Sequence, residues 1–144
     1  MKSEHGNYVI EDGLERMDFE RVHGWLSKTY WSPGIAQTKI ERAATNSAMV
    51  VSSYIGNTQV GYMRVISDKT TFAWIADVFV DEGHRKKGIA KAMVQFALKH
   101  PDFQNLRRWV LATRDAHSVY AEVGFIPLDF PDRWMLHYPP KDTE

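Results

Sequence analysis

A single stretch decides the fold of this chain: Val78-Phe79-Val80-Asp81-Glu82-Gly83-His84-Arg85-Lys86-Lys87-Gly88-Ile89-Ala90. Its first residues end an apolar, strand-like run that starts at Phe72, and from Ile89 onward the apolar residues follow the helical period. A strand, a tight glycine-containing loop and a helix start present free backbone N–H groups and the positive end of the helix dipole to an anion. Three cations, at positions 85–87, lie beside that loop. The residues alone therefore predict phosphate binding here.

Two other interpretations of the loop compete with phosphate binding. Most charge runs are solvated turns, and this one could be such a turn. A nucleotide-binding P-loop needs G-x-x-x-x-G-K-[ST]; Gly83 and Gly88 have that spacing, but Ile89 and Ala90 replace the Lys and Ser/Thr that would bind phosphate and magnesium. The P-loop is therefore rejected.

The rest of the chain alternates strand and helix patterns. Gly56-Asn57-Thr58 is typical of a hairpin turn, Asp18 of a helix N-cap and Pro101 of a helix stop. The pattern predicts an α+β fold of order β-α-α-β-β-β-α-β-α-β-β with one βαβ unit at 71–112. The predicted elements are strands at 8–10, 48–55, 59–66, 71–80, 108–112, 125–126 and 134–138, and helices at 19–30, 35–45, 89–100 and 116–123.

Length and charge limit the class of protein. The 144 residues, without repeats or linkers, predict one domain over 1–144. The 18 basic residues balance 18 acidic ones, which argues against a nucleic-acid or membrane-surface partner. The N-terminus has no signal-like apolar core, and the longest apolar run is too short to cross a bilayer. We expect a cytoplasmic protein.

Two motifs connect this pattern to a known family. Arg85-Lys86-Lys87-Gly88-Ile89-Ala90 has the form Arg-x-x-Gly-x-Ala, and Tyr120 to Phe125 has the form Tyr-x-x-x-Gly-Phe. Together they resemble the GNAT superfamily of acyl-CoA-dependent N-acetyltransferases, and the resemblance runs from Phe72 through Phe125. It implies a mainly antiparallel, twisted sheet flanked by helices. The stretches 112–117 and 131–135 further resemble a bacterial branch whose acceptors are mostly unassigned.

The resemblance implies a binding mode for the co-substrate acetyl-CoA, without a metal. Backbone amides of the loop would bind the pyrophosphate, and the main chain of the preceding strand would pair with the pantetheine arm. The implied loop residues are Arg85, Lys86, Lys87, Gly88, Ile89, Ala90 and Lys91, and the implied strand residues are Val78, Phe79 and Val80.

Catalytic candidates follow from the same resemblance and from the residue chemistry. Tyr120 occupies the family position whose hydroxyl protonates the leaving thiolate. Asp77, a lone carboxylate in an apolar strand, is a candidate base; equally, it could be a structural carboxylate paired with Arg114 or another cation. Asp115, His117 or a bound water are alternatives. Because the chain has no cysteine, no acetyl-cysteine intermediate can form, and direct transfer in a ternary complex is expected.

Acceptor selection is expected from aromatic residues around a predicted turn. Tyr30 and Trp31, with His117, are the candidate acceptor-binding residues; aromatics so placed could equally be core or homodimer contacts. The expected function is acetyl transfer from acetyl-CoA to an amine, on a small molecule. The alternatives are a non-catalytic acyl-CoA-binding or sensing module, and a protein N-acetyltransferase.

Overall fold

One six-stranded sheet organises the protein, whose computed structural model describes residues 1–141. Neighbouring strands are antiparallel except β5 and β6, which are parallel. The strands, in spatial order, are β1 (Lys2–His5), β2 (Tyr8–Asp12), β3 (Met49–Ile55), β4 (Thr58–Ser67), β5 (Phe72–Val80) and β6 (Arg108–Val110). The helices are α1 (Phe19–Leu26), α2 (Gln37–Asn46), α3 (Ile89–Lys99) and α4 (His117–Ala121). Short 3-10 turns occupy Glu82–His84, Pro101–Phe103 and Pro131–Arg133. The predicted mixed, mainly antiparallel sheet flanked by helices is confirmed.

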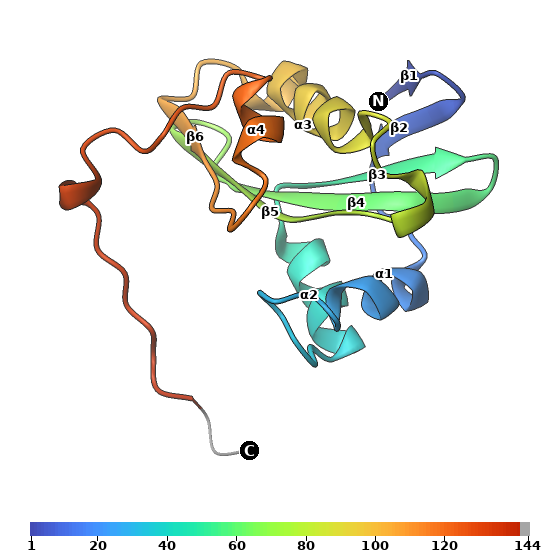
Figure 1. Cartoon of the computed structure of the whole chain (residues 1–144), viewed down its shortest axis with the longest axis horizontal. Coiled ribbons are helices and arrows are strands. Elements are labelled where there is room, and N and C mark those ends of the chain that lie inside the picture. Colours follow the sequence, from blue (N-terminus) through green and yellow to red (C-terminus); the bar gives the residue numbers. More distant parts are fainter. Residues whose placement is uncertain (142–144) are drawn as a thin grey trace.

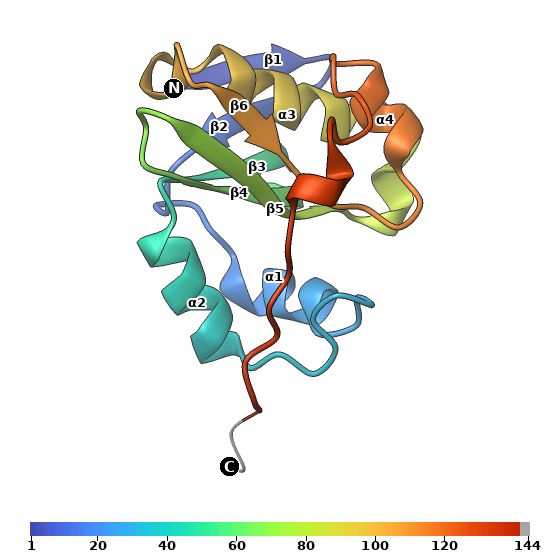
Figure 2. The same cartoon turned by 90° about the vertical axis from the view of Figure 1, so that its left-hand side faces the viewer.

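Helices cover both faces of the sheet. Helices α1 and α2 lie on one face, and α3 and α4 lie on the other (Figures 1 and 2). Alternation along β3 explains how one sheet serves two cores: Met49 and Val51 join the cluster under α3, whereas Val50 joins the cluster under α1 and α2. The sheet is therefore the middle of three layers.

Residues near the helix ends explain where α1 begins and where α3 stops. The Asp18 carboxylate accepts a hydrogen bond from the Arg21 backbone N–H at 3.1 Å and caps α1 as predicted. Helix α3 ends at Lys99, just before Pro101, which cannot continue it. The βαβ unit is also confirmed, because α3 connects the parallel strands β5 and β6.

Both ends of the chain differ from the prediction. The N-terminus forms an additional strand, β1, which was missed because its sequence Lys-Ser-Glu-His lacks any apolar alternation; it is an outer strand whose first three side chains are exposed. The strands predicted at 125–126 and 134–138 were wrong. Residues 134–138 are irregular and exposed in this chain, because Phe130 adopts a left-handed conformation (φ 52°) before Pro131 and the segment finds no ladder partner among residues 1–141.

Candidate active site

Strand β6 pairs with only the beginning of β5. Pairing joins Phe72–Trp74 to Arg108–Val110, and the remaining residues of β5, 75–80, have no partner on that edge within the described chain. Asp77 has a positive φ of 57°, and the register with β4 shifts between Tyr62 and Arg64, which bends β5 at this point. The outer edge of β5 is therefore open beyond Trp74 within residues 1–141.

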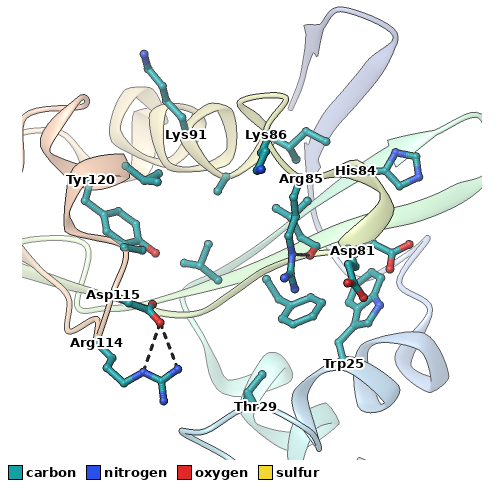
Figure 3. Close-up of a pocket in the computed structure, with 18 of the residues that line it drawn as sticks. Trp25, Thr29, Asp81, His84, Arg85, Lys86, Lys91, Arg114, Asp115 and Tyr120 are labelled. Carbon is teal, nitrogen blue, oxygen red and sulfur yellow. Dashed lines mark hydrogen bonds and ion pairs between the residues drawn. The ribbon is translucent and has the colours of Figure 1, made fainter.

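A cleft of about 1130 Å³ occupies this end of the sheet. It is bounded by the end of β5, the loop before α3, the first residues of α3, helix α1 and helix α4 (Figure 3). Most of the predicted coenzyme-binding residues line it: Val78, Phe79, Val80, Arg85, Lys86, Gly88, Ile89, Ala90 and Lys91. Lys87 does not.

The first turn of α3 provides unpaired backbone donors. Gly88 is the N-cap residue and adopts the left-handed conformation with φ 76°, and no side chain caps the helix. The first intrahelical bond runs from the Ala92 N–H to the Gly88 carbonyl at 2.9 Å, so the N–H groups of Ile89, Ala90 and Lys91 precede the helical ladder. This geometry binds anions through backbone groups and the helix dipole.

The N-terminal hairpin supports this loop from behind. His5 Nε2 lies 2.6 Å from the Lys87 carbonyl oxygen, and a Cβ on Gly88 would lie 3.3 Å from the same nitrogen. The Tyr8 hydroxyl lies 2.8 Å from His84 Nδ1. The sequence assigned no role to His84 and missed β1 altogether, so this support was not predicted. The Lys87 carbonyl is thereby engaged by the N-terminal hairpin.

The cations of the loop occupy different places. Arg85 turns back over β5: its Nε donates to the Val80 carbonyl at 2.9 Å, and its guanidinium lies 5.2 Å from the centre of the Phe79 ring. Lys86 lines the cleft near α3 (Figure 3). Lys91 lies 3.7 Å from the Glu122 carboxylate. Because Arg85 occupies the Val80 carbonyl, main-chain pairing at that oxygen would require the arginine to move.

Tyr120 approaches the cleft from α4. Its side chain is buried, and its hydroxyl points into the cleft (Figure 3). Burial, with a smaller contribution from Tyr30, raises the pKa of Tyr120 to about 12. The phenol is therefore protonated at neutral pH and is able to donate a proton.

A second cavity of about 590 Å³ adjoins the first and shares Tyr30, Trp31, Val78, Tyr120 and residues 114–116 with it. Asp77 lines this cavity and has both carboxylate oxygens engaged: Trp31 Nε1 donates to one at 2.9 Å and Arg64 Nε donates to the other at 2.6 Å. The aromatic turn between α1 and α2 is thereby attached to the bend of β5.

Tyr30 connects the same turn to the chain before α4. Its hydroxyl accepts a hydrogen bond from the Arg114 backbone N–H at 2.9 Å, and the Arg114 guanidinium lies 4.0 Å from its ring centre. Arg114 pairs with Asp115 at 3.2 Å, rather than with Asp77. His117 is exposed and lines neither cavity.

Several lining residues were not found from the sequence. Trp25 of α1 stacks on Phe79 with ring centres 5.3 Å apart, and Arg64 of β4 faces Asp77. Trp25 lies between Val22 and Leu26, the buried residues of α1, and Arg64 lies inside an apolar strand, so the sequence did not indicate that either side chain lines a cavity. Trp25, Arg64 and Thr29 are the principal additions, and Asp115, which the sequence offered as an alternative base, lines both cavities.

Within residues 1–141, no helix has the length and apolar content needed to span a bilayer, and no group of three or more potential ligand side chains could hold a metal ion.

Comparison with known proteins agrees with this architecture. The model of the acetyltransferase (GNAT) family matches residues 11–125. A protein assigned to the GNAT family in Xanthomonas campestris pv. campestris has a solved structure that is 39% identical, with a TM-score of 0.83 over 91% of this chain and 94% of that chain.

More distant structures share the fold. A protein assigned as an acetyltransferase in Deinococcus radiodurans R1 is 16% identical, with a TM-score of 0.74 over 94% of this chain and 91% of that one. One from Clostridium acetobutylicum, whose structure was determined with acetyl-CoA, is 15% identical, with a TM-score of 0.66 over 91% and 96% of the two chains. No curated protein matches the chain. On the family model and the Xanthomonas structure, the chain belongs to the GNAT family of acetyltransferases.

Proposed function

We propose that the protein transfers the acetyl group of acetyl-CoA directly to an amine of a small-molecule acceptor. One observation carries this proposal: the unpaired edge of β5 leads to the uncapped start of α3, and a buried, protonated tyrosine faces the cleft between them. An anion site, an extended edge and a proton donor, adjoining a second cavity, are what transfer from a pyrophosphate-bearing thioester requires. The aromatic second cavity suits a small acceptor.

The coenzyme would bind along features already present. The backbone N–H groups at the start of α3 and the cations Arg85 and Lys86 suit the pyrophosphate. The free edge at Val78 and Phe79 suits the amide-containing pantetheine arm, which can add to a sheet like a strand. Stacking of Trp25 on Phe79 supports that edge from the α1 side.

Tyr120 would act as the general acid. The neutral amine nitrogen attacks the thioester carbonyl carbon, and the C–S bond then breaks. The departing sulfur takes the Tyr120 proton, and the proton lost by the amine returns to the phenolate through water. An alkylamine with a pKa of about 10.4 is almost entirely protonated at pH 7, so it must lose a proton before it attacks.

Asp77 is proposed to help prepare the acceptor. It lines the acceptor cavity, as a base would, but its two oxygens are held by Arg64 and Trp31, which favours a positioning role. Asp77→Asn distinguishes these roles. A base predicts a kcat loss of about 10²- to 10⁴-fold. A positioning carboxylate predicts a raised acceptor KM with a smaller change in kcat, and Trp31→Phe would then reproduce that change.

Aromatic surfaces dominate the acceptor cavity. Tyr30, Trp31 and Trp74 line it, and the charges of Arg64 and Arg114 are each paired with a carboxylate. We infer an acceptor with an apolar or aromatic body next to its amine, because a polycationic acceptor would need unpaired carboxylates. His117 is exposed and lies outside the cavity lining, so we assign it to the rim of the proposed acceptor site.

Thiol release from acetyl-CoA tests the proposal. A panel should include alkylamines, arylalkylamines, amino acids and a lysine-containing peptide. Release that depends on a small amine supports the proposal. Release only with the peptide favours a protein acetyltransferase, and acetyl-CoA binding by calorimetry without turnover on any amine favours a binding or sensing module. An intact mass unchanged after incubation with acetyl-CoA alone would exclude a stable acetyl-enzyme.

A further inference from the structure

The cleft and the acceptor cavity meet at one ion pair. Arg114 and Asp115, in the chain just before α4, line both of them, as does Tyr120. The two charged side chains extend toward the cleft on the side from which Tyr120 approaches (Figure 3). An acceptor whose amine lies near the Tyr120 hydroxyl would therefore contact this pair.

The position of the Arg114 side chain is fixed by Tyr30. The Arg114 backbone N–H donates to the Tyr30 hydroxyl at 2.9 Å, and the guanidinium lies over the Tyr30 ring, 4.0 Å from its centre. A guanidinium stacked on an aromatic ring keeps its N–H donors, which lie in its own plane, available for hydrogen bonds. An arginine held in this way is prepared to bind a planar anion such as a carboxylate.

The contact between Arg114 and Asp115 is loose. Two guanidinium nitrogens, Nε and Nη2, donate to the same oxygen, Asp115 Oδ2, at 3.4 and 3.2 Å. Charge-assisted hydrogen bonds of this kind are usually about 2.7–2.9 Å long. The two side chains are 64% and 65% exposed, and an ion pair so exposed adds little stability. A ligand can therefore separate the two charges at small cost.

The other charges of the acceptor cavity are already committed. Arg64 and Asp77 are 2.6 Å apart and mostly buried, and Asp77 also accepts from Trp31. The cavity thus contains two arginines and two aspartates, whose charges balance. An acceptor that brings only an ammonium group would occupy Asp115 and leave the Arg114 charge without a partner. An acceptor that brings both an ammonium and a carboxylate group leaves no charge unpaired.

We propose that the acceptor is an α-amino acid with an aromatic or large apolar side chain, whose carboxylate binds Arg114 and whose α-amine binds Asp115. This inference rests on the proposed function and names its substrate class. Because the two charges of the pair are adjacent, the two charges of the ligand must be adjacent as well, and an α-amino acid carries both on one carbon. Tyr30, Trp31 and Trp74 line the cavity and offer aromatic surfaces to the side chain.

The α-nitrogen is the nucleophile in this arrangement. It binds as an ammonium group and loses one proton to water before it attacks the thioester carbonyl carbon. The N–C bond forms, the C–S bond breaks, and the departing sulfur takes the Tyr120 proton. A second proton of the nitrogen returns to the phenolate through water. Arg114 and Asp115 exchange no proton in this sequence; they bind and orient the acceptor.

Thiol release with matched acceptors tests the proposal. L-phenylalanine and phenethylamine share the ring and the amine, but only the amino acid has the carboxylate. We expect kcat/KM to be about tenfold or more higher for L-phenylalanine, the value of one charge-assisted hydrogen bond. L-tryptophan and tryptamine repeat the comparison with a larger ring. A kcat/KM for the amino acids equal to or below that for the amines overturns the proposal.

The variant Arg114→Gln isolates the carboxylate contact. We expect it to lower kcat/KM by about 10- to 100-fold for L-phenylalanine and by less than about threefold for phenethylamine. Each acceptor is compared with itself, so the difference in basicity between the two amines cancels. Arg107→Gln is the matched control, because this arginine is exposed and lines neither cavity. Equal losses on both acceptors overturn the proposal, since Arg114 would then act through the fold.

The variant Asp115→Asn tests the amine contact. Both acceptors carry the amine, so KM should rise for both, and an unchanged KM for both overturns the assignment of Asp115. Turnover of phenethylamine without a preference for L-phenylalanine overturns the amino acid acceptor but leaves acetyl transfer to an amine intact. Absence of turnover on every amine overturns both the acceptor and the proposed function.

Discussion

The two halves of the cleft are built differently. At the half proposed to bind the coenzyme, much of the lining comes from one stretch of sequence, between Val78 and Lys91, which the N-terminal hairpin contacts through His5. At the half proposed to bind the acceptor, the lining includes side chains from the turn between α1 and α2, from β4 and β5, and from the chain before α4, connected through Asp77 and Tyr30. The first half is specified by local sequence, whereas the second depends on long-range packing. A family can therefore keep one coenzyme while its acceptors diverge.

The largest expected effect lies where the two halves meet. Tyr120→Phe keeps the ring that packs against Phe125 but removes the proton donor. We expect kcat to fall by about 10²- to 10⁴-fold, the usual range for general acid catalysis, with the KM for acetyl-CoA little changed. Steady-state kinetics measure both constants. Turnover equal to that of the wild type would remove Tyr120 from the mechanism.

The pH profile sharpens the role of the same residue. The acid must be protonated, so its contribution is lost only as pH rises through its pKa of about 12. The neutral fraction of an alkylamine acceptor rises about tenfold per pH unit below about pH 10. We expect kcat/KM to rise with that slope, without a descending limb below about pH 10. A descending limb centred near the ordinary tyrosine value of 10.0 would contradict the shifted phenol.

Substitution of Gly88 is the best test of the half of the cleft proposed to bind the coenzyme. A valine there must adopt a positive φ, at a cost of about 1–3 kcal/mol, and its Cβ would press on His5. We expect acetyl-CoA affinity to fall by about tenfold or more, since 1.4 kcal/mol is a factor of ten in binding. Calorimetry measures the affinity. Gly56→Val, at the β3–β4 turn with φ 56°, carries similar strain far from the cleft and should leave binding unchanged.

The smallest effect is expected from substitution of His5, which contacts the loop before α3. His5→Ala removes the contact with the Lys87 carbonyl, worth about 0.5–1.5 kcal/mol for a hydrogen bond. We expect the KM for acetyl-CoA to rise about 2- to 12-fold with kcat unchanged, and His5→Gln to restore part of the loss. Glu4→Ala, in the same strand and exposed, is the matched control. A kcat change without a KM change would place His5 outside coenzyme positioning.

The contrast between the two halves of the cleft also explains which features could be predicted from the sequence. The β5–loop–α3 stretch was predictable because an apolar strand, a glycine and a helical period are adjacent in sequence. The partners of Asp77 were not, because Arg64 lies 13 residues away and Trp31 lies 46 residues away, and only the bend in β5 brings them together. Strand β1 lacked an apolar pattern because it lies at the edge of the sheet. Residues 134–138 carry a strand-like pattern but pair with no strand among residues 1–141.

The central claim is that acetyl-CoA binds along the free edge of β5 and at the start of α3. Titration of acetyl-CoA into ¹⁵N-labelled protein, followed by the chemical shifts of backbone amides, tests it residue by residue. We expect the largest shifts at residues 78–80 and 85–91, a smaller set at Tyr120, and none in α2. Shifts confined to other surfaces, or no saturable shift at all, would contradict the account.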